Sequence, residues 1–144
     1  MVSRSNKIIL IEGPNLNLIK KRKEIYQSNK NLKEIIKNIS DIVDIEYYQS
    51  NLEGEIINKL QEVILNDDII GVIINPAAYS HYSLAISDSL EMIKKLKVEV
   101  HLTNIFNRES HRQNLITAKN VNSVISGMGN YGYYLAAQYI LENS

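Results

Sequence analysis

The chain has 144 residues, 44% hydrophobic and 22% charged, as is ordinary for one globular domain with its own core. Acidic and basic side chains number 16 each, so the formal net charge is zero and nucleic acid is not the expected partner. The absence of cysteine excludes disulfides, thiolate metal sites and cysteine nucleophiles. The apolar runs are too short for a membrane helix, and the one after the first seven residues is too short for a signal peptide. We therefore expect a cytoplasmic, soluble protein with one domain over residues 1–144.

Strand-like apolar runs alternate with helical periodicity along the whole chain. In chain order, we predict a strand at 8–11, a helix at 32–39, a strand at 43–48, a helix at 56–64, a strand at 69–74, a helix at 82–93, strands at 98–102 and 121–126, and a final helix at 135–140. Such alternation with apolar strands predicts an α/β, flavodoxin-like doubly wound fold, a five-stranded parallel sheet with helices on both faces.

Two of these helices have a predicted buried face. The spacing of the apolar side chains assigns Tyr82, Ala85, Ile86, Leu90 and Ile93 to one face of the third helix, and Leu135, Ala136, Tyr139 and Ile140 to one face of the last.

Polar clusters follow four of the predicted strands. They are residues 13–17, 49–51, 75–81 and 101–103. In a doubly wound sheet, ligands bind beyond the carboxyl ends of the strands, so we expect these clusters to form one site. Two long irregular segments, 13–31 and 103–118, lie at the same end, and loops of that length in a small domain are usually functional.

Arginine and histidine gather in one part of the chain. All three histidines and two of the four arginines lie between residues 75 and 112. Arg108 and Arg112 are four residues apart and could share a helix face; in a chain with so few arginines we favour anion or polyol binding over a solvated pair. Three histidines suggest zinc, but no two of them have the close spacing of a metal pair on one helix, so we predict no metal.

His101 ends a predicted strand, and Glu99 lies two residues earlier on the same face. An isolated histidine among apolar neighbours is usually structural, but at a strand's carboxyl end a role as general acid is favoured. The carboxylate would hold the ring in one tautomer and stabilise its charged form. Asn75 and His81 bracket the turn before a helix, and they either contact a ligand or shape a turn that Ser80 or Ser83 caps.

The first long loop contains Arg22 and Tyr26, four residues apart. This loop is either a mobile surface segment or an arm that brings a guanidinium to a phenol and makes the phenol a usable base.

Residues 127–132 read GMGNYG and match the dinucleotide fingerprint G-x-G-x-x-G. They follow the last strand, and no acidic residue lies about 20 positions further on to hold a ribose. We therefore interpret the glycines as close packing of the final helix against the sheet, with nucleotide binding as a weaker hypothesis.

Five motifs together resemble the type II 3-dehydroquinate dehydratase family. GPNLN begins at Gly13, YQSNLEGE at Tyr48, INPAAYSH at Ile74, VEVHLTNI at Val98 and SGMGNYGY at Ser126. The resemblance runs from Lys7 to about Leu141, and five motifs in the family's order are very specific. It implies a single catalytic domain that converts 3-dehydroquinate to 3-dehydroshikimate and water by anti elimination through an enolate. This is a shikimate-pathway step toward chorismate and aromatic amino acids, and it needs no cofactor.

The resemblance also implies a role for each motif residue. Tyr26 would be the base, with Arg22 favouring its phenolate, and His101 the acid, oriented by Glu99. Asn15 would help hold a water that stabilises the enolate. The substrate-binding groups would be Asn75, His81, the backbone of Leu102 and Thr103, and Arg112. Asp88 would reach the site of a neighbouring subunit, which implies a homo-oligomer, a trimer that commonly assembles into a dodecamer.

The arm from Leu18 to Tyr26 departs from the family pattern. It lacks the glycine that usually precedes the arginine region and the proline that usually follows the arginine. The alternative function is therefore a non-catalytic small-molecule binder on the same scaffold, with an arm that does not place Tyr26.

Overall fold

The computed structural model describes residues 6–144; the first residues of the segment considered as a signal peptide lie outside that range. Five parallel strands form one sheet in the order β2-β1-β3-β4-β5. They are β1 (Lys7–Glu12), β2 (Asp44–Gln49), β3 (Ile69–Asn75), β4 (Leu96–His101) and β5 (Ser123–Ser126). Each predicted strand overlaps an observed one, and the order is that of flavodoxin-like doubly wound folds, which confirms the predicted fold class.

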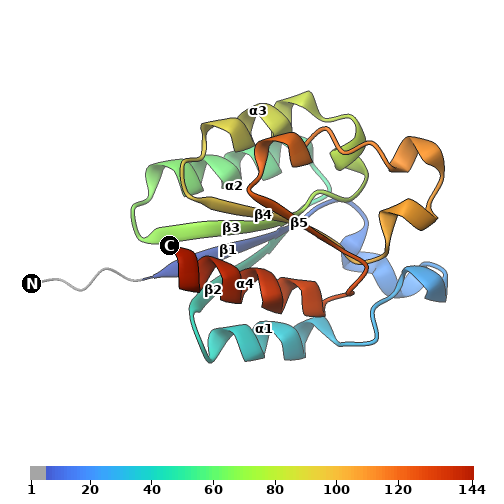
Figure 1. Cartoon of the computed structure of the whole chain (residues 1–144), viewed down its shortest axis with the longest axis horizontal. Coiled ribbons are helices and arrows are strands. Elements are labelled where there is room, and N and C mark those ends of the chain that lie inside the picture. Colours follow the sequence, from blue (N-terminus) through green and yellow to red (C-terminus); the bar gives the residue numbers. More distant parts are fainter. Residues whose placement is uncertain (1–5) are drawn as a thin grey trace, which may run out of the picture.

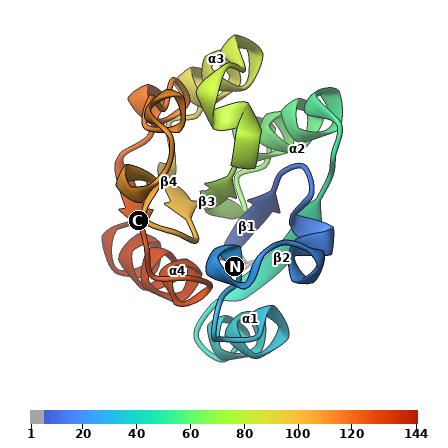
Figure 2. The same ribbon diagram turned by 90° about the vertical axis from the view of Figure 1, so that its right-hand side faces the viewer.

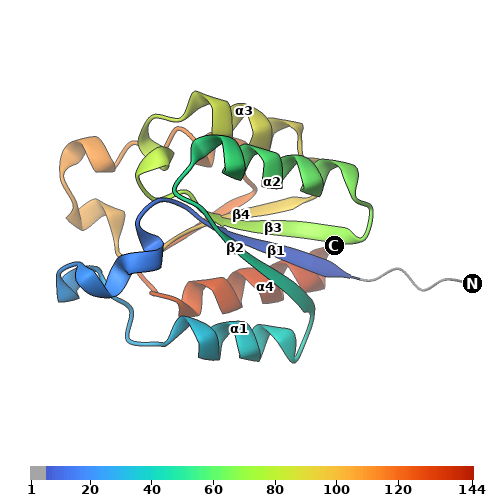
Figure 3. The ribbon, with the colours of Figure 1, turned by 180° about the vertical axis from the view of Figure 1, so that it is seen from behind.

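Two pairs of helices cover the sheet (Figures 1 and 3). Helices α1 (Leu32–Ser40) and α4 (Tyr131–Asn143) lie on one face, and α2 (Glu53–Leu65) and α3 (Leu84–Met92) lie on the other. Alternate residues of the central strand β1 supply the two cores: Ile8 and Leu10 pack toward α1 and α4, whereas Ile9 and Ile11 pack toward α2. All four are fully buried, which agrees with a parallel sheet covered on both faces.

The predicted buried faces of two helices were partly wrong. Helix α3 begins only at Leu84, and its buried residues are Ile86, Ser87, Ser89 and Leu90, whereas Tyr82 is 63% exposed. Ala85 is also exposed. In α4, Tyr139 is 40% exposed, and Tyr133 and Ala137 take the inner face beside Ala136 and Ile140. Serines complete the inner face of α3, and Tyr133 with Ala137 completes that of α4, so the spacing chosen from the apolar residues alone misplaced part of each face.

Two of the helices are capped at their N-termini by a short polar side chain. Asn31 accepts a hydrogen bond from the Lys33 N–H at 2.8 Å at the start of α1, and Ser83 accepts one from Ile86 at 3.0 Å at the start of α3. Ser80, the other capping candidate, instead donates to the Ala77 carbonyl at 2.7 Å.

The long segments 13–31 and 103–118 both lie beyond the carboxyl ends of the strands, the end that faces the viewer in Figure 2. Each is built from short 3₁₀ turns: Leu16–Lys21 and Glu24–Tyr26 in the first, Ile105–Asn107 and Ser110–Arg112 in the second. A further 3₁₀ turn, Ala77–His81, follows β3. No helix within residues 6–144 has the length and apolarity needed to cross a membrane.

Candidate active site

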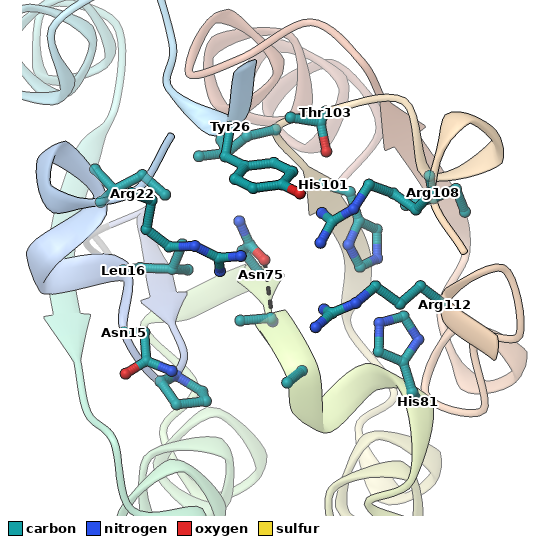
Figure 4. A pocket seen from close by; sticks show the side chains of 16 residues that line it. Asn15, Leu16, Arg22, Tyr26, Asn75, His81, His101, Thr103, Arg108 and Arg112 are labelled. Carbon is teal, nitrogen blue, oxygen red and sulfur yellow. Dashed lines mark hydrogen bonds between the residues drawn. The ribbon is translucent and has the colours of Figure 1, made fainter. Parts of the chain in front are cut away.

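A pocket of about 140 Å³ opens among these loops (Figure 4). The predicted residues that line it are Asn15, Arg22, Tyr26, Asn75, His81, His101, Leu102, Thr103 and Arg112. Two predicted residues do not line it: Glu99 is fully buried and bonded to His101, and Asp88 is exposed on α3. The four polar clusters at the strand ends were expected to converge, and the strand-end residues that line the pocket come from three of them.

His101 is held by a buried chain of hydrogen bonds. Its Nε2 lies 2.7 Å from Glu99 Oε2, and the hydroxyl of Thr117 donates to Glu99 Oε1 at 2.5 Å. Both Glu99 and Thr117 are fully buried, and His101 is 7% exposed. The carboxylate accepts the Nε2 proton, which fixes the ring tautomer and leaves Nδ1 as the nitrogen available to a ligand. The predicted pairing of Glu99 with His101 is confirmed.

Tyr26 lies between two arginines at the mouth of the pocket. The guanidinium carbon of Arg22 is 4.6 Å from the centre of its ring, and that of Arg108 is 4.4 Å away. The prediction that the arm brings Arg22 beside the phenol is therefore confirmed. Both guanidinium groups thus lie within the range of a cation–π contact with the Tyr26 ring.

The arm that carries Tyr26 is tied down at several points. The Gln27 side-chain amide donates to the Lys20 and Arg22 carbonyls at 3.2 and 2.8 Å. The hydroxyl of Ser28 accepts from the Asn130 N–H at 2.8 Å, at the start of α4. The arm is thus fixed both to itself and to the far end of the chain.

Gly129 makes this docking possible. Its φ is +57°, a left-handed conformation that side chains rarely adopt, and a Cβ there would lie 2.5 Å from the hydroxyl oxygen of Ser28. Gly132 fits the predicted helix packing, since a Cβ there would meet Ile125 and Val100 at 3.1 Å. The glycine cluster therefore serves two packing purposes, arm docking and helix–sheet contact.

Arg108 and Arg112 do not share a helix face, contrary to one prediction. They end two separate 3₁₀ turns, and Arg108 itself is extended, with φ −96° and ψ 174°. Both nonetheless line the pocket, as expected for anion binding. Within residues 6–144 the Nε of each is buried without a hydrogen-bond partner, although the Glu109 carboxylate is 3.2 Å from Arg112 Nε. Such donors are suited to an anionic oxygen from a ligand.

His81 is positioned as a neutral hydrogen-bonding group. Its Nδ1 lies 3.0 Å from the Asn114 carbonyl oxygen, which can only accept, so Nδ1 carries the hydrogen. Burial lowers the pKa of His81, with the nearby Arg112 acting in the same direction. The ring is therefore neutral near pH 7, and its Nε2 is an acceptor for a hydroxyl group.

The turns after β1, β3 and β4 supply the rest of the wall. A Cβ on Gly13 would lie 2.6 Å from the Pro76 carbonyl oxygen, so glycine lets the first two turns meet. The Leu102 and Thr103 carbonyls accept hydrogen bonds from the Gly129 N–H and the Ser126 hydroxyl. What this last turn can offer a ligand is mainly its own N–H groups and the Thr103 hydroxyl. Within residues 6–144, no three His, Cys, Asp or Glu side chains are grouped to hold a metal ion.

Comparison with known proteins agrees with this geometry. The family model described as Dehydroquinase class II matches residues 6–141. The chain belongs to the class II dehydroquinase family. Among its relatives, a 3-dehydroquinate dehydratase of Thermotoga petrophila is 43% identical over 139 residues, which cover 93% of this chain and 94% of the relative. One from Clostridium botulinum is 44% identical over 143 residues, 96% of each chain.

Solved structures of class II dehydroquinases have the same fold. The type II dehydroquinase from Butyrivibrio crossotus matches with a TM-score of 0.88 at 37% identity, covering 96% of this chain and 99% of that one. The type II dehydroquinase from Propionibacterium acnes matches with a TM-score of 0.85 at 31% identity, covering 98% and 100%. The family resemblance predicted from the five motifs is thus confirmed.

Sequence reasoning missed several residues of the dehydroquinase site. Arg108 was expected to bind an anion, but not to stack on Tyr26. Thr117 lies 18 residues from Glu99 in an irregular segment, where no sequence signal points to it. Glu12 did carry a signal, because a carboxylate at the end of an apolar strand needs a partner.

Proposed function

We propose that the protein is a type II 3-dehydroquinate dehydratase, a hydro-lyase that forms 3-dehydroshikimate and water without a cofactor. The observation that carries this proposal is the meeting of Tyr26, flanked by two arginines, with the His101–Glu99 pair in one pocket. Tyr26 lies in the loop after β1 and His101 at the end of β4. Elimination of water needs both a base and an acid, and the fold brings one candidate for each into the same pocket.

Each step is assigned to a group of the pocket. Tyr26, as phenolate, removes a proton beside the ketone and leaves an enolate. A water held with the help of Asn15 stabilises that enolate. His101 then protonates the departing hydroxyl from its Nδ1, while Glu99 holds the opposite nitrogen and stabilises the charged ring. After the elimination Tyr26 holds the proton it removed and His101 lacks the one it gave. A proton therefore returns from Tyr26 to His101 through solvent before the next turnover, and the net change is substrate to product and water.

The remaining groups hold the substrate. Arg112 binds the carboxylate through its guanidinium, and neutral His81 accepts a hydrogen bond from a substrate hydroxyl. Asn75 and the N–H groups of Leu102 and Thr103 bind further oxygens. A pocket that is small and carries three arginines is suited to a compact anion with several hydroxyl groups.

The test is to add 3-dehydroquinate and follow the ultraviolet absorbance of the conjugated enone product. We expect turnover by the unaltered protein, and its abolition by Tyr26→Phe and by His101→Ala without loss of fold. Matched controls are Tyr139→Phe and His111→Ala, which change exposed residues outside the pocket and should leave the rate unchanged. No turnover at micromolar protein would refute the proposal.

The alternative, a non-catalytic binder, requires an arm that fails to place Tyr26. The docked arm and the two stacked arginines argue against it. Tight binding of 3-dehydroquinate without product would favour it instead.

The proposed enzyme acts as a homo-oligomer, a trimer that assembles into a dodecamer. Helix α3 exposes Asp88 together with Leu84 and Met92, which are 69% and 52% exposed. An apolar strip of this kind supports contact with a second subunit, to which Asp88 would extend. Sedimentation should give a multiple of three chains, and a monomer would contradict the assembly. A cytoplasmic location stays a prediction from composition.

A further inference from the structure

A buried carboxylate lies behind the pocket, at the end of β1. Glu12 is 2% exposed and forms no ion pair with any lysine, arginine or histidine of residues 6–144. Its oxygens accept two hydrogen bonds of 2.6 Å, from the hydroxyls of Tyr47 and Tyr133. Burial raises the pKa of Glu12, since an unpaired charge away from water is unfavourable. None of the proposed chemical steps uses this group.

Tyr133 links Glu12 by hydrogen bonds to Asn75, a residue of the pocket wall. It is fully buried on α4, and its oxygen accepts a hydrogen bond from Asn75 Nδ2 at 3.0 Å. Burial and the neighbouring Glu12 raise the pKa of Tyr133, so the hydroxyl keeps its proton. A hydroxyl has one hydrogen to donate; because Glu12 receives it, the lone pairs of the oxygen face Asn75.

The other end of the chain of bonds is fixed as well. Asn75 Oδ1 accepts from the backbone N–H of Ala77 at 3.1 Å, and a backbone N–H can only donate. An acceptor carboxylate at one end and an obligate donor at the other leave one orientation for the Asn75 amide. Its oxygen faces Ala77, one amide hydrogen faces Tyr133, and the second hydrogen is left for the pocket that Asn75 lines.

We propose that Glu12 and Tyr133 are positioning residues that fix the Asn75 side chain as a hydrogen-bond donor to an oxygen of the substrate. This inference rests on the proposed function for the identity of that substrate. With no acceptor at position 12, the Tyr133 hydrogen can turn toward Asn75, and the amide loses its fixed orientation.

The test compares Glu12→Leu, Glu12→Gln and Tyr133→Phe. Glutamine keeps an acceptor oxygen for Tyr133 and can turn its NH₂ group toward Tyr47, so it should rescue what leucine loses. We expect Glu12→Leu and Tyr133→Phe to lower kcat/KM for 3-dehydroquinate about tenfold, mainly through KM, and Glu12→Gln to stay within about twofold. Tyr48→Phe is the matched control, because among residues 6–144 the hydroxyl of Tyr48 bonds to Glu55 alone and the variant should equal the unaltered protein.

Calorimetric titration of 3-dehydroquinate into the same variants on a His101→Ala background measures binding without turnover. Affinity should fall about tenfold for Glu12→Leu and for Tyr133→Phe, and recover with Glu12→Gln. Tyr133→Phe keeps the ring volume and serves as the second variant if Glu12→Leu does not fold.

Equal affinity in all variants overturns the inference, as does a loss with Glu12→Gln as large as with Glu12→Leu. If the expected binding pattern appears but the unaltered protein gives no product, only the proposed reaction fails. If the His101→Ala protein binds no 3-dehydroquinate and the unaltered protein gives no product, both fail.

Discussion

Replacing Gly129 by alanine should release the arm that carries Tyr26. The φ of +57° at this residue costs an alanine about 1 kcal/mol. The new Cβ would lie 2.5 Å from the Ser28 hydroxyl oxygen, so Ser28 must move and its 2.8 Å hydrogen bond from the Asn130 N–H is lost, at about 1 kcal/mol more. Together, about 2 kcal/mol shifts the balance between docked and released arm roughly 30-fold.

The assay is steady-state turnover of 3-dehydroquinate with thermal denaturation in parallel. We expect Gly129→Ala to reduce kcat/KM by up to about 30-fold, the limit set by that shift, with a modest loss of stability because the core is untouched. Gly54→Ala is the control: no atom lies within 4 Å of the added Cβ, and alanine favours helix α2 by at most about 1 kcal/mol. If Gly129→Ala is as active as Gly54→Ala, the arm does not depend on this glycine and the reasoning is wrong.

Three further predictions concern stability and the supports of the site. Burial raises the pKa of Glu12 above 4.5, so its contribution to stability is greatest below pH 4.5 and is lost as the pH rises through the raised value. Glu12→Gln should therefore exceed the unaltered protein in free energy of unfolding at pH 8, but not at pH 4; a constant difference across urea titrations would contradict this. Thr117→Val removes the donor to Glu99 and should lower kcat about tenfold with KM unchanged, and a change in KM alone would count against a role in positioning the acid. Gln27→Ala should lower kcat about fivefold in the same assay, because the Gln27 amide holds the arm through the Lys20 and Arg22 carbonyls. Gln61→Ala, an exposed change on α2, should have no effect. Equal rates in the two variants would show that these hydrogen bonds do not position the arm.

The layered fold was predictable because the strand pattern is strong. Short continuous apolar runs such as Ile69–Ile74 are typical of parallel strands covered on both faces. The polar residues that follow such strands must lie at the same end of the sheet. The pairing of Glu99 with His101 followed from the two-residue repeat of a strand.

Contacts between distant irregular segments were not predictable in the same way. Nothing in a linear pattern joins Thr117 to Glu99 or Arg108 to Tyr26, because these residues meet through loops whose paths are set by individual backbone hydrogen bonds. Helical spacing misled at Arg108 and Arg112, since four residues mean one face only in a continuous helix.

The glycine-rich turn between β5 and α4 has a consequence for searches of genomes. Its letters coincide with those of nucleotide-binding proteins because both need bare backbone that another group can approach closely. In those proteins the group that approaches the backbone is a pyrophosphate. Here it is Ser28 of the same polypeptide. A pattern scan detects the glycines but not the group that packs against them, so the position of such a turn in the fold decides its function.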